Sequence, residues 1–123
     1  MEQTVFVIDD SPTMRQMVAF TLANAGFQVV EAGNGQEALA KLEASPQPAL
    51  VVTDLNMPGM DGLSLIRELR KLPAMKFVPI LILTTESSAD KKAEGRSAGA
   101  TGWIVKPFNP DQFMKVVQKV LPA

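Results

Sequence analysis

Short runs of apolar residues alternate with helical spacing along the whole chain. Five runs rich in valine, isoleucine or leucine predict β-strands, at residues 4–8, 27–30, 49–53, 78–83 and 101–105. Apolar positions spaced by three and four residues predict helices between these runs and after the last one. In the first helix, this spacing predicts one buried stripe, made of Met14, Met17, Val18, Thr21, Leu22 and Ala25.

The helix boundaries have their own signals. Ser11-Pro12 and Asn109-Pro110 each place a capping residue before a proline that suits the first helical turn. Gly26 is expected to end the first helix. Three further helices are predicted, at residues 35–43, 61–71 and 87–98. The last of these has little but alanine on its apolar side, so we expect low local stability there.

Strands that alternate with helices in this way predict an α/β fold, a parallel sheet with helices on both faces. The continuously apolar runs at 50–52 and 80–83 suit the centre of the sheet, and the alternating segment Phe27-Gln28-Val29 suits an edge. We expect a flavodoxin-like, doubly wound, five-stranded sheet in the order 2-1-3-4-5. A single domain is expected over residues 1–123.

Composition narrows the chemistry. The chain is 46% hydrophobic and 20% charged, as in ordinary globular domains, and it contains neither cysteine nor histidine. These two absences exclude disulfides, thiolate nucleophiles, Ser-His-Asp catalysis and zinc sites built on cysteine or histidine. There is no basic, apolar leader and no apolar run of membrane-spanning length, so we expect a cytoplasmic protein without a membrane partner.

The two halves of the chain carry opposite charge. Residues 1–61 contain eight acidic and two basic residues, whereas residues 62–123 contain five acidic and ten basic residues. This asymmetry predicts an acidic pocket in one place and a basic face in another. Solvated helix surfaces are an equally good explanation at this stage.

Polar residues follow four of the five predicted strands. Asp9 and Asp10 follow the first, Asp54 the third, Thr84 the fourth and Lys106 the fifth. The carboxyl ends of parallel strands meet at one edge of the sheet, and strands one and three are neighbours in the expected order. Three carboxylates therefore converge, which requires a cation, and oxygen ligands favour Mg²⁺, with Mn²⁺ or Ca²⁺ as alternatives. The group suits phosphoryl transfer to an aspartate.

Each of these residues has a simpler explanation when taken alone. An aspartate between a strand and a helix is commonly an N-cap, and this can account for Asp61. It accounts poorly for Asp9 and Asp10, because Ser11 already fills the cap position. Lys106 alone could be a solvated lysine, so the conjunction of residues carries the prediction.

Two other motifs can be set aside. An EF-hand loop beginning at Asp54 would have Leu65 at its twelfth position, where a glutamate ligand is needed. The segment 33–38 matches the pattern G-x-G-x-x-A of a dinucleotide site, but it follows the second predicted strand, whereas that motif belongs after the first. A turn that leads into a helix is the better reading of this segment.

Taken together, the motifs resemble those of the receiver domains of two-component response regulators, and in particular the stand-alone, CheY-like chemotaxis regulators. The resemblance rests on Asp9-Asp10, on Asp54 with residues 57–62 (Met-Pro-Gly-Met-Asp-Gly), on Thr84 and on Lys106-Pro107-Phe108. It covers the whole chain, and each motif follows the expected strand.

The resemblance implies the chemistry of the site. Asp54 would accept a phosphoryl group from the phosphohistidine of a sensor histidine kinase. Mg²⁺, or Mn²⁺ in its place, would be bound by Asp10, Asp54 and the backbone carbonyl of Asn56, with Asp9 acting partly through water. Lys106 would pair with the phosphoaspartate.

The resemblance also implies a switch. Thr84 would turn onto a phosphoryl oxygen, and Pro107 would form a cis peptide with the preceding lysine. Trp103, where tyrosine or phenylalanine is commoner in the family, would fill the space that Thr84 leaves; a half-buried packing residue is the less favoured alternative. Asn56 and Glu86 would tune hydrolysis of the acyl phosphate, and this pair resembles that of regulators with short-lived phosphorylation.

The output face implied by the family consists of the fourth helix, the fifth strand and the last helix. Its helices carry five basic residues, which predict a partner of acidic character, and its strand carries the aromatic residue. The predicted partner face is therefore Lys91, Lys92, Arg96, Trp103, Lys115 and Lys119.

The sequence thus predicts a monomeric, phosphorylation-activated switch that catalyses only its own phosphotransfer and dephosphorylation and is otherwise no enzyme. Chemotaxis is the expected pathway, with the flagellar motor switch as target and a separate phosphatase as a further candidate partner; no nucleic-acid partner is expected. A phosphorelay intermediate, a phosphate sink and a receiver cut from a longer regulator remain alternatives. A small phosphatase that uses a phosphoaspartate is a distant one, because no segment is left for a substrate cap.

Overall fold

The structure contains the predicted alternation of strands and helices. The computed structural model describes residues 3–45 and 47–121. Its elements are β1 (Thr4–Ile8), α1 (Pro12–Asn24), β2 (Gln28–Ala32), α2 (Gly35–Glu43), β3 (Leu50–Thr53), α3 (Gly62–Lys71), the short 3-10 helix η1 (Pro73–Met75), β4 (Ile80–Thr84), α4 (Ala89–Ala98), β5 (Gly102–Val105) and α5 (Pro110–Val120). The predicted boundaries differ from these by at most two residues, and η1 is an additional element.

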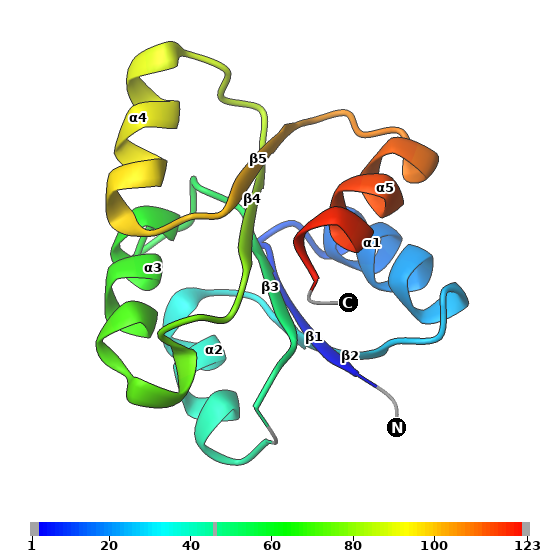
Figure 1. Cartoon of the computed structure of the whole chain (residues 1–123), viewed down its shortest axis with the longest axis horizontal. Coiled ribbons are helices and arrows are strands. Elements are labelled where there is room, and N and C mark those ends of the chain that lie inside the picture. The colour runs from blue at the N-terminus through cyan, green and yellow to red at the C-terminus, as the bar shows by residue number, and fades with distance from the viewer. Residues whose placement is uncertain (1–2, 46, 122–123) are drawn as a thin grey trace.

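All neighbouring strands pair in parallel, in the order β2-β1-β3-β4-β5. The predicted strand order is therefore confirmed, with β3 at the centre and β2 at an edge. Figure 1 shows the sheet between two helical layers, with α1 and α5 on one face and α2, α3 and α4 on the other. The carboxyl ends of β1, β3, β4 and β5 consequently open on one edge of the sheet, where the candidate residues were expected.

The strands alternate their side chains between two cores. Val5 and Val7 belong to the core under α1 and α5, whereas Phe6 and Ile8 belong to the core under α2, α3 and α4. Every residue of β1 is buried because helices cover both faces of the sheet. This two-sided burial explains why the strand sequence is continuously apolar.

The predicted helix caps are present. The side chains of Ser11, Asp61 and Asn109 each accept a backbone N–H from the first turn of the helix that follows. Asn34 caps α2 in the same way, so the segment 33–38 is a turn and a helix start, as predicted. Gly26 lies just beyond α1 with φ of +97°, a conformation that favours glycine.

The buried face of α1 differs from the predicted stripe. Val18 and Leu22 are buried as predicted, but Met17 is 52% exposed, and Ala25 lies beyond the end of the helix and is exposed. Ala19, which was not in the stripe, is buried. The contact face is turned around the helix axis toward residues 15 and 19, and the side chain of Arg15 is only 20% exposed.

The helices are short, nine to thirteen residues each. Each covers part of the sheet with one side and exposes the other (Figure 1). Within residues 3–45 and 47–121, no helix has the length and apolar character that crossing a membrane would require.

Candidate functional site

Three aspartates meet at the carboxyl ends of β1 and β3. Asp9, Asp10 and Asp54 each offer a carboxylate oxygen within 4.8 Å of those of the other two. Asp9 and Asp54 are buried, whereas Asp10 is exposed. The convergence follows from the strand order, because β1 and β3 are hydrogen-bonded neighbours. Three negative charges are thus held together at one edge of the sheet.

Lys106 provides a positive charge within this cluster. Its Nζ donates to Asp9 Oδ2 at 2.8 Å and to Asp54 Oδ2 at 3.3 Å. The side chains of all three residues are no more than about a tenth exposed. The lysine follows β5, and β3 and β4 lie between β5 and β1 in the sheet. The side chain therefore spans the strand ends to reach both carboxylates.

The carboxylates also determine the protonation of Lys106. Burial by itself lowers the pKa of this lysine, but the hydrogen bond that it donates to Asp9 and the negative charges of Asp54 and Asp9 outweigh that effect. The net effect is a raised pKa. The lysine is therefore a permanent cation at neutral pH.

Backbone groups hold the other carboxylate oxygens. The N–H of Ser11 donates to Asp9 Oδ1 at 2.9 Å, and the N–H of Leu55 donates to Asp54 Oδ1 at 2.7 Å. In each aspartate, one oxygen thus accepts from the main chain and the other from Lys106. This arrangement offsets much of the repulsion between the two buried carboxylates.

Thr84 and Trp103 are linked through the loop that follows β4. Thr84 is fully buried, and its Oγ1 accepts the N–H of Glu86 at 3.4 Å. Trp103 is half-buried, and its Nε1 donates to the carbonyl oxygen of Glu86 at 2.9 Å. The indole of β5 is thereby tied to the β4–α4 loop beside the site.

Gly95 of α4 makes room for this indole. A Cβ atom at Gly95 would lie 2.9 Å from Cζ3 of Trp103 and 2.9 Å from Cδ1 of Ile82. Such distances are too short for carbon atoms in contact, so a larger residue at position 95 would displace the ring. Gly95 and Trp103 therefore form a matched pair between α4 and β5.

The remaining predicted residues lie close to the cluster in sequence. The peptide bond between Lys106 and Pro107 is cis. Asn56, two residues after Asp54, is exposed. Gly62 begins α3 against the main chain of Asp54, where a Cβ atom would overlap the aspartate carbonyl oxygen.

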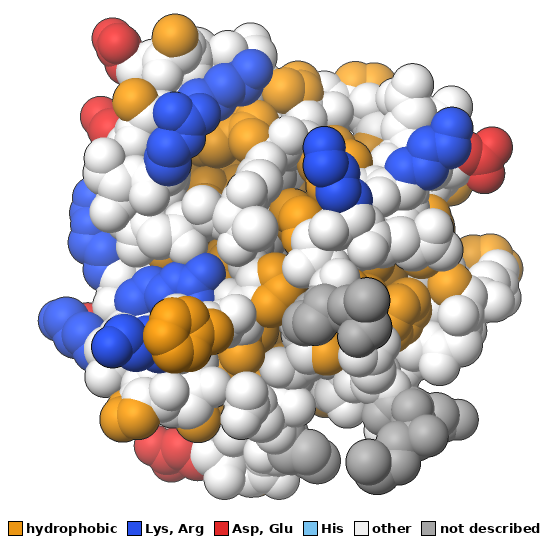
Figure 2. Space-filling model, viewed as in Figure 1, with side chains coloured by type: hydrophobic (Ala, Val, Ile, Leu, Met, Phe, Trp, Pro, Cys, Tyr) orange, Lys and Arg blue, Asp and Glu red, His pale blue; other side chains and the backbone are white. Residues whose placement is uncertain are grey.

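The predicted basic face is exposed on two helices. Figure 2 shows lysine and arginine side chains at α4 and over α5 on the same side of the molecule. All five predicted basic residues are exposed, and Lys91 also pairs with Glu94 at 3.4 Å. Two shallow pockets adjoin Trp103 between these helices, one toward α4 and one toward α5. This surface therefore combines the indole of Trp103 on β5 with exposed positive charges on α4 and α5.

The donor set suits a divalent cation that prefers oxygen. The three aspartates supply carboxylate oxygens only, and the exposed carboxylate of Asp10 leaves the cluster open to solvent. Asp9 has both oxygens engaged, by Ser11 and Lys106. Asp54 is engaged in the same way, by Leu55 and Lys106. The residues present therefore fit Mg²⁺, with the exposed carboxylate of Asp10 as the most accessible ligand.

Arg15 was not singled out from the sequence, although it lies next to the site. Its Nη1 donates to the carbonyl oxygen of Asp9 at 2.8 Å, and its Nε donates to Glu31 Oε1 at 3.2 Å. One signal could have drawn attention to it. Arg15 and Lys41 are the only basic residues among the first 61, and Arg15 follows Asp10 by five residues.

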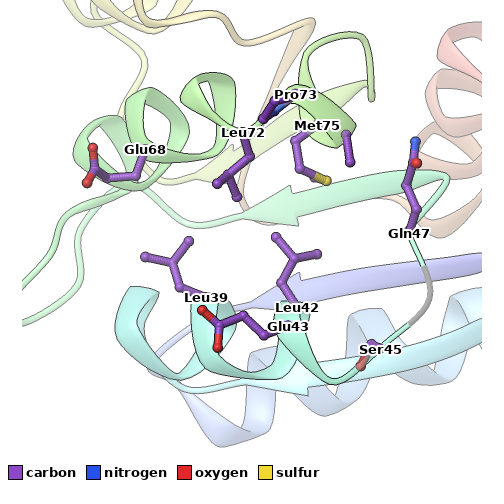
Figure 3. Close-up of a pocket in the computed structure, with 10 residues that line it drawn as sticks. Leu39, Leu42, Glu43, Ser45, Gln47, Glu68, Leu72, Pro73 and Met75 are labelled. Carbon is purple, nitrogen blue, oxygen red and sulfur yellow. The ribbon is translucent and has the colours of Figure 1, made fainter.

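A larger groove lies elsewhere and does not coincide with the site. It has a volume of about 510 Å³ and lies between α2 and the segment that contains η1 (Figure 3). Leu39, Leu42 and Leu72 point into it, and none of the carboxylate cluster lines it. The groove and the charged cluster are therefore separate features of the surface.

Comparison with protein families assigns the chain to a known class. Residues 5–118 match the model of the response regulator receiver domain, and the chain belongs to this family. As a class, such domains are signalling modules rather than classical enzymes.

Named relatives narrow the comparison. The chain is 38% identical to Chemotaxis protein CheY1 of Helicobacter pylori, over 95% of each chain. It is 34% identical to the phosphate regulon transcriptional regulatory protein PhoB of Pseudomonas aeruginosa, over 97% of this chain and 52% of the relative. The solved structure of chemotaxis protein CheY4 of Vibrio cholerae shares 46% identity and a TM-score of 0.94, covering 98% of this chain and all of the other. The chain is thus a CheY-like, two-component receiver.

Proposed function

We propose that this chain is a cytoplasmic signalling switch that accepts a phosphoryl group on Asp54. The observation that carries the proposal is the contact of Lys106 with both Asp54 and Asp9 at the open edge of the sheet. A buried carboxylate beside a permanent cation is positioned to attack phosphorus, because the negative charge of the incoming phosphoryl oxygens is offset there.

Phosphoryl transfer to Asp54 would exchange a phosphorus–nitrogen bond for a phosphorus–oxygen bond. A carboxylate oxygen of Asp54 bonds to phosphorus, the bond from phosphorus to the imidazole nitrogen of the kinase phosphohistidine breaks, and its electron pair stays on that nitrogen. Mg²⁺ held by Asp10, Asp54 and the carbonyl of Asn56, with Asp9 partly through water, would offset phosphoryl charge. Lys106 orients the acyl phosphate. Its hydrolysis by water releases inorganic phosphate and regenerates the carboxylate.

Glu86 and Asn56 are the proposed tuning residues for that hydrolysis. Glu86 lies in the β4–α4 loop, where its main-chain carbonyl accepts a hydrogen bond from Trp103 Nε1. Its side chain accepts the N–H of Ser88 at 3.3 Å. Polar groups in such positions can orient the attacking water. We therefore propose rapid self-dephosphorylation, with a separate phosphatase as an additional partner.

The link from Thr84 to Trp103 supports a switch between the site and the α4-β5-α5 surface. Both residues bind the main chain of Glu86, so movement of Thr84 toward a phosphoryl group would move the loop that holds the indole. The exposed lysines on α4 and α5 favour an acidic partner. Because two relatives are named as chemotaxis proteins, we propose chemotaxis as the pathway and the flagellar motor switch as target.

Fluorescence of Trp103, the chain's single tryptophan, tests the proposal. Mg²⁺ is added first and beryllofluoride, a phosphoryl mimic, second. We expect a saturable, Mg²⁺-dependent response that is lost in Asp54→Ala. No response to Mg²⁺, in fluorescence or calorimetry, would overturn the carboxylate site; a response to Mg²⁺ without one to beryllofluoride would overturn the switch.

A further inference from the structure

We propose that Arg15 is a positioning residue for the divalent cation: by holding the peptide group between Asp9 and Asp10, it sets the direction from which Asp10 enters the carboxylate cluster. This inference rests on the proposed function, because it concerns the affinity of the same cluster for Mg²⁺.

Every polar group of Asp9 has a partner. Its N–H donates to the carbonyl of Ala32 at 3.1 Å, and its two carboxylate oxygens accept from Ser11 and Lys106. The remaining group is the carbonyl oxygen, which accepts from Arg15 Nη1 at 2.8 Å. Asp9 is therefore held at four points, and only the bond from Arg15 acts on the peptide that leads to Asp10.

That peptide determines where the next carboxylate lies. The carbonyl of Asp9 and the N–H of Asp10 belong to one rigid plane, so fixing the oxygen fixes the plane. Asp10 is exposed and lies outside any strand or helix. Without Arg15, the plane could rotate, and the Asp10 carboxylate would have to be ordered when the cation binds. Ordering a residue at that step opposes binding.

The guanidinium is itself held in place. Arg15 Nε donates to Glu31 of β2 at 3.2 Å, and the arginine side chain is only 20% exposed. The main-chain carbonyl of Glu31 in turn accepts from Lys41 Nζ at 2.6 Å. A planar fork can bind Asp9 and Glu31 together, whereas the single ammonium of lysine cannot reproduce both bonds in the same geometry.

Geometry and charge make opposite predictions for this residue. Arg15 is positive, so its charge alone opposes binding of a cation nearby, and removing that charge should strengthen binding. If positioning dominates, removing the arginine should weaken binding instead. The sign of the effect therefore separates the two roles.

Calorimetric titration of Mg²⁺ into the full chain tests the inference. Arg15→Lys keeps the charge, Arg15→Gln removes it, and Arg67→Lys, at an exposed arginine of α3, is the matched control. We expect the Mg²⁺ dissociation constant to rise about tenfold in Arg15→Lys, as for other residues that orient metal ligands, and to rise also in Arg15→Gln. The control should match the wild type.

Urea unfolding without Mg²⁺, measured on the same proteins, separates positioning from stability. A purely structural role would lower the unfolding free energy and leave the dissociation constant of the folded protein unchanged, which overturns the inference. Tighter binding in Arg15→Gln overturns it as well. If the wild type binds no Mg²⁺, the proposed function fails and this inference fails with it. If the wild type binds Mg²⁺ and both Arg15 variants bind it with the same dissociation constant, this inference alone fails.

Discussion

Lys106 and Asp9, separated by 97 positions in the chain, form an ion pair of 2.8 Å at the carboxyl edge of the sheet. The same ammonium lies 3.3 Å from Asp54. The pair gives the cluster an internal counter-charge, so two buried carboxylates can face each other without a metal. It also places the ammonium of Lys106 beside Asp54, the residue proposed to receive the phosphoryl group.

Removing this lysine should destabilise the Mg²⁺-free protein. In Lys106→Met, Asp9 and Asp54 lose their common partner and repel each other, so we expect the unfolding free energy to fall by about 2 kcal/mol, less than for a fully enclosed pair because the site edge meets solvent. Urea unfolding measures the change. Mg²⁺ should restore more stability to the variant than to the wild type.

The matched control is Lys115→Met, the same substitution at an exposed position of α5. It should change the unfolding free energy by less than about 0.5 kcal/mol. Equal stability of Lys106→Met and the wild type without Mg²⁺ would show that the ion pair contributes nothing to the fold.

Glycine at position 62 should be required for folding. In Gly62→Ala, the new methyl group would overlap the carbonyl oxygen of Asp54, which is main chain and cannot rotate away. We expect a loss of more than about 3 kcal/mol, measured by thermal or urea unfolding. Gly59→Ala is the comparison: it meets no atom within 4 Å, although its φ of +77° makes alanine unfavourable by about 1 kcal/mol. The prediction fails if the two variants are equally stable.

The close contact between the Trp103 indole and Gly95 predicts that substitutions at these two positions are energetically coupled. Gly95→Ala should raise helix propensity by about 1 kcal/mol but crowd the indole, so we expect a net loss of about 1 kcal/mol and a shifted tryptophan emission. In a Trp103→Phe background the smaller ring relieves the contact with the indole and leaves only that with Cδ1 of Ile82, so alanine should be less destabilising there. A double-mutant cycle of unfolding free energies measures this coupling, and strictly additive effects would contradict it.

The carboxylate of Glu37 should contribute to the acid sensitivity of the fold. The N–H of Gly33 at 2.6 Å is the main cause of its lowered pKa, with Lys41 and the charge of Arg15 also lowering it and burial opposing. A pKa below its unfolded value of 4.5 means stability that is present above pH 4.5 and lost as the pH falls through the folded-state pKa.

Glu37→Gln should therefore lose less stability on acidification, although solvent screening makes the difference small. The amide keeps an acceptor for Gly33 while carrying no charge, and Glu31 and Asp9, which face the same arginine, remain unchanged. Urea unfolding between about pH 7 and about pH 3 measures both slopes. Parallel curves for the two proteins would contradict the prediction.

Charge reversal on α4 should weaken the partner complex. Lys91 and Lys92 are exposed on the proposed output face. Replacing both by glutamate should therefore lower the affinity of the beryllofluoride-treated protein for its acidic target about tenfold or more. The probe is the flagellar motor-switch protein, in calorimetry at two salt concentrations. Reversal of both Lys71 and Lys76, exposed residues outside the output face, is a control that changes the total charge by the same amount. Unchanged affinity in the double variant would remove the acidic-partner proposal.

Local patterns in the sequence were enough to predict the order of the elements and the position of the aspartates. The spacing of apolar residues differs between strands and helices and can be seen in a short stretch of sequence. Residues 4–8 and 50–53 could therefore be recognised as strands without knowledge of their partners. Asp9, Asp10 and Asp54 could be placed together because parallel strands end at one edge whatever their side chains do. The caps at Ser11 and Asn109 were equally local and equally predictable.

The side chains that reach across elements could not be predicted from such patterns, because their contacts depend on how the elements pack. Periodicity places Met17 on the buried stripe of α1, but the helix is rotated on the sheet so that Arg15 faces Asp9 and Glu31 and Met17 faces solvent. The contact of Trp103 with Gly95 likewise depends on how α4 lies over β5. Such rotations are set by the sum of contacts with distant residues, and one helix sequence is compatible with several of them. A local pattern therefore fixes what each element is, and the packing of all elements decides what each side chain meets.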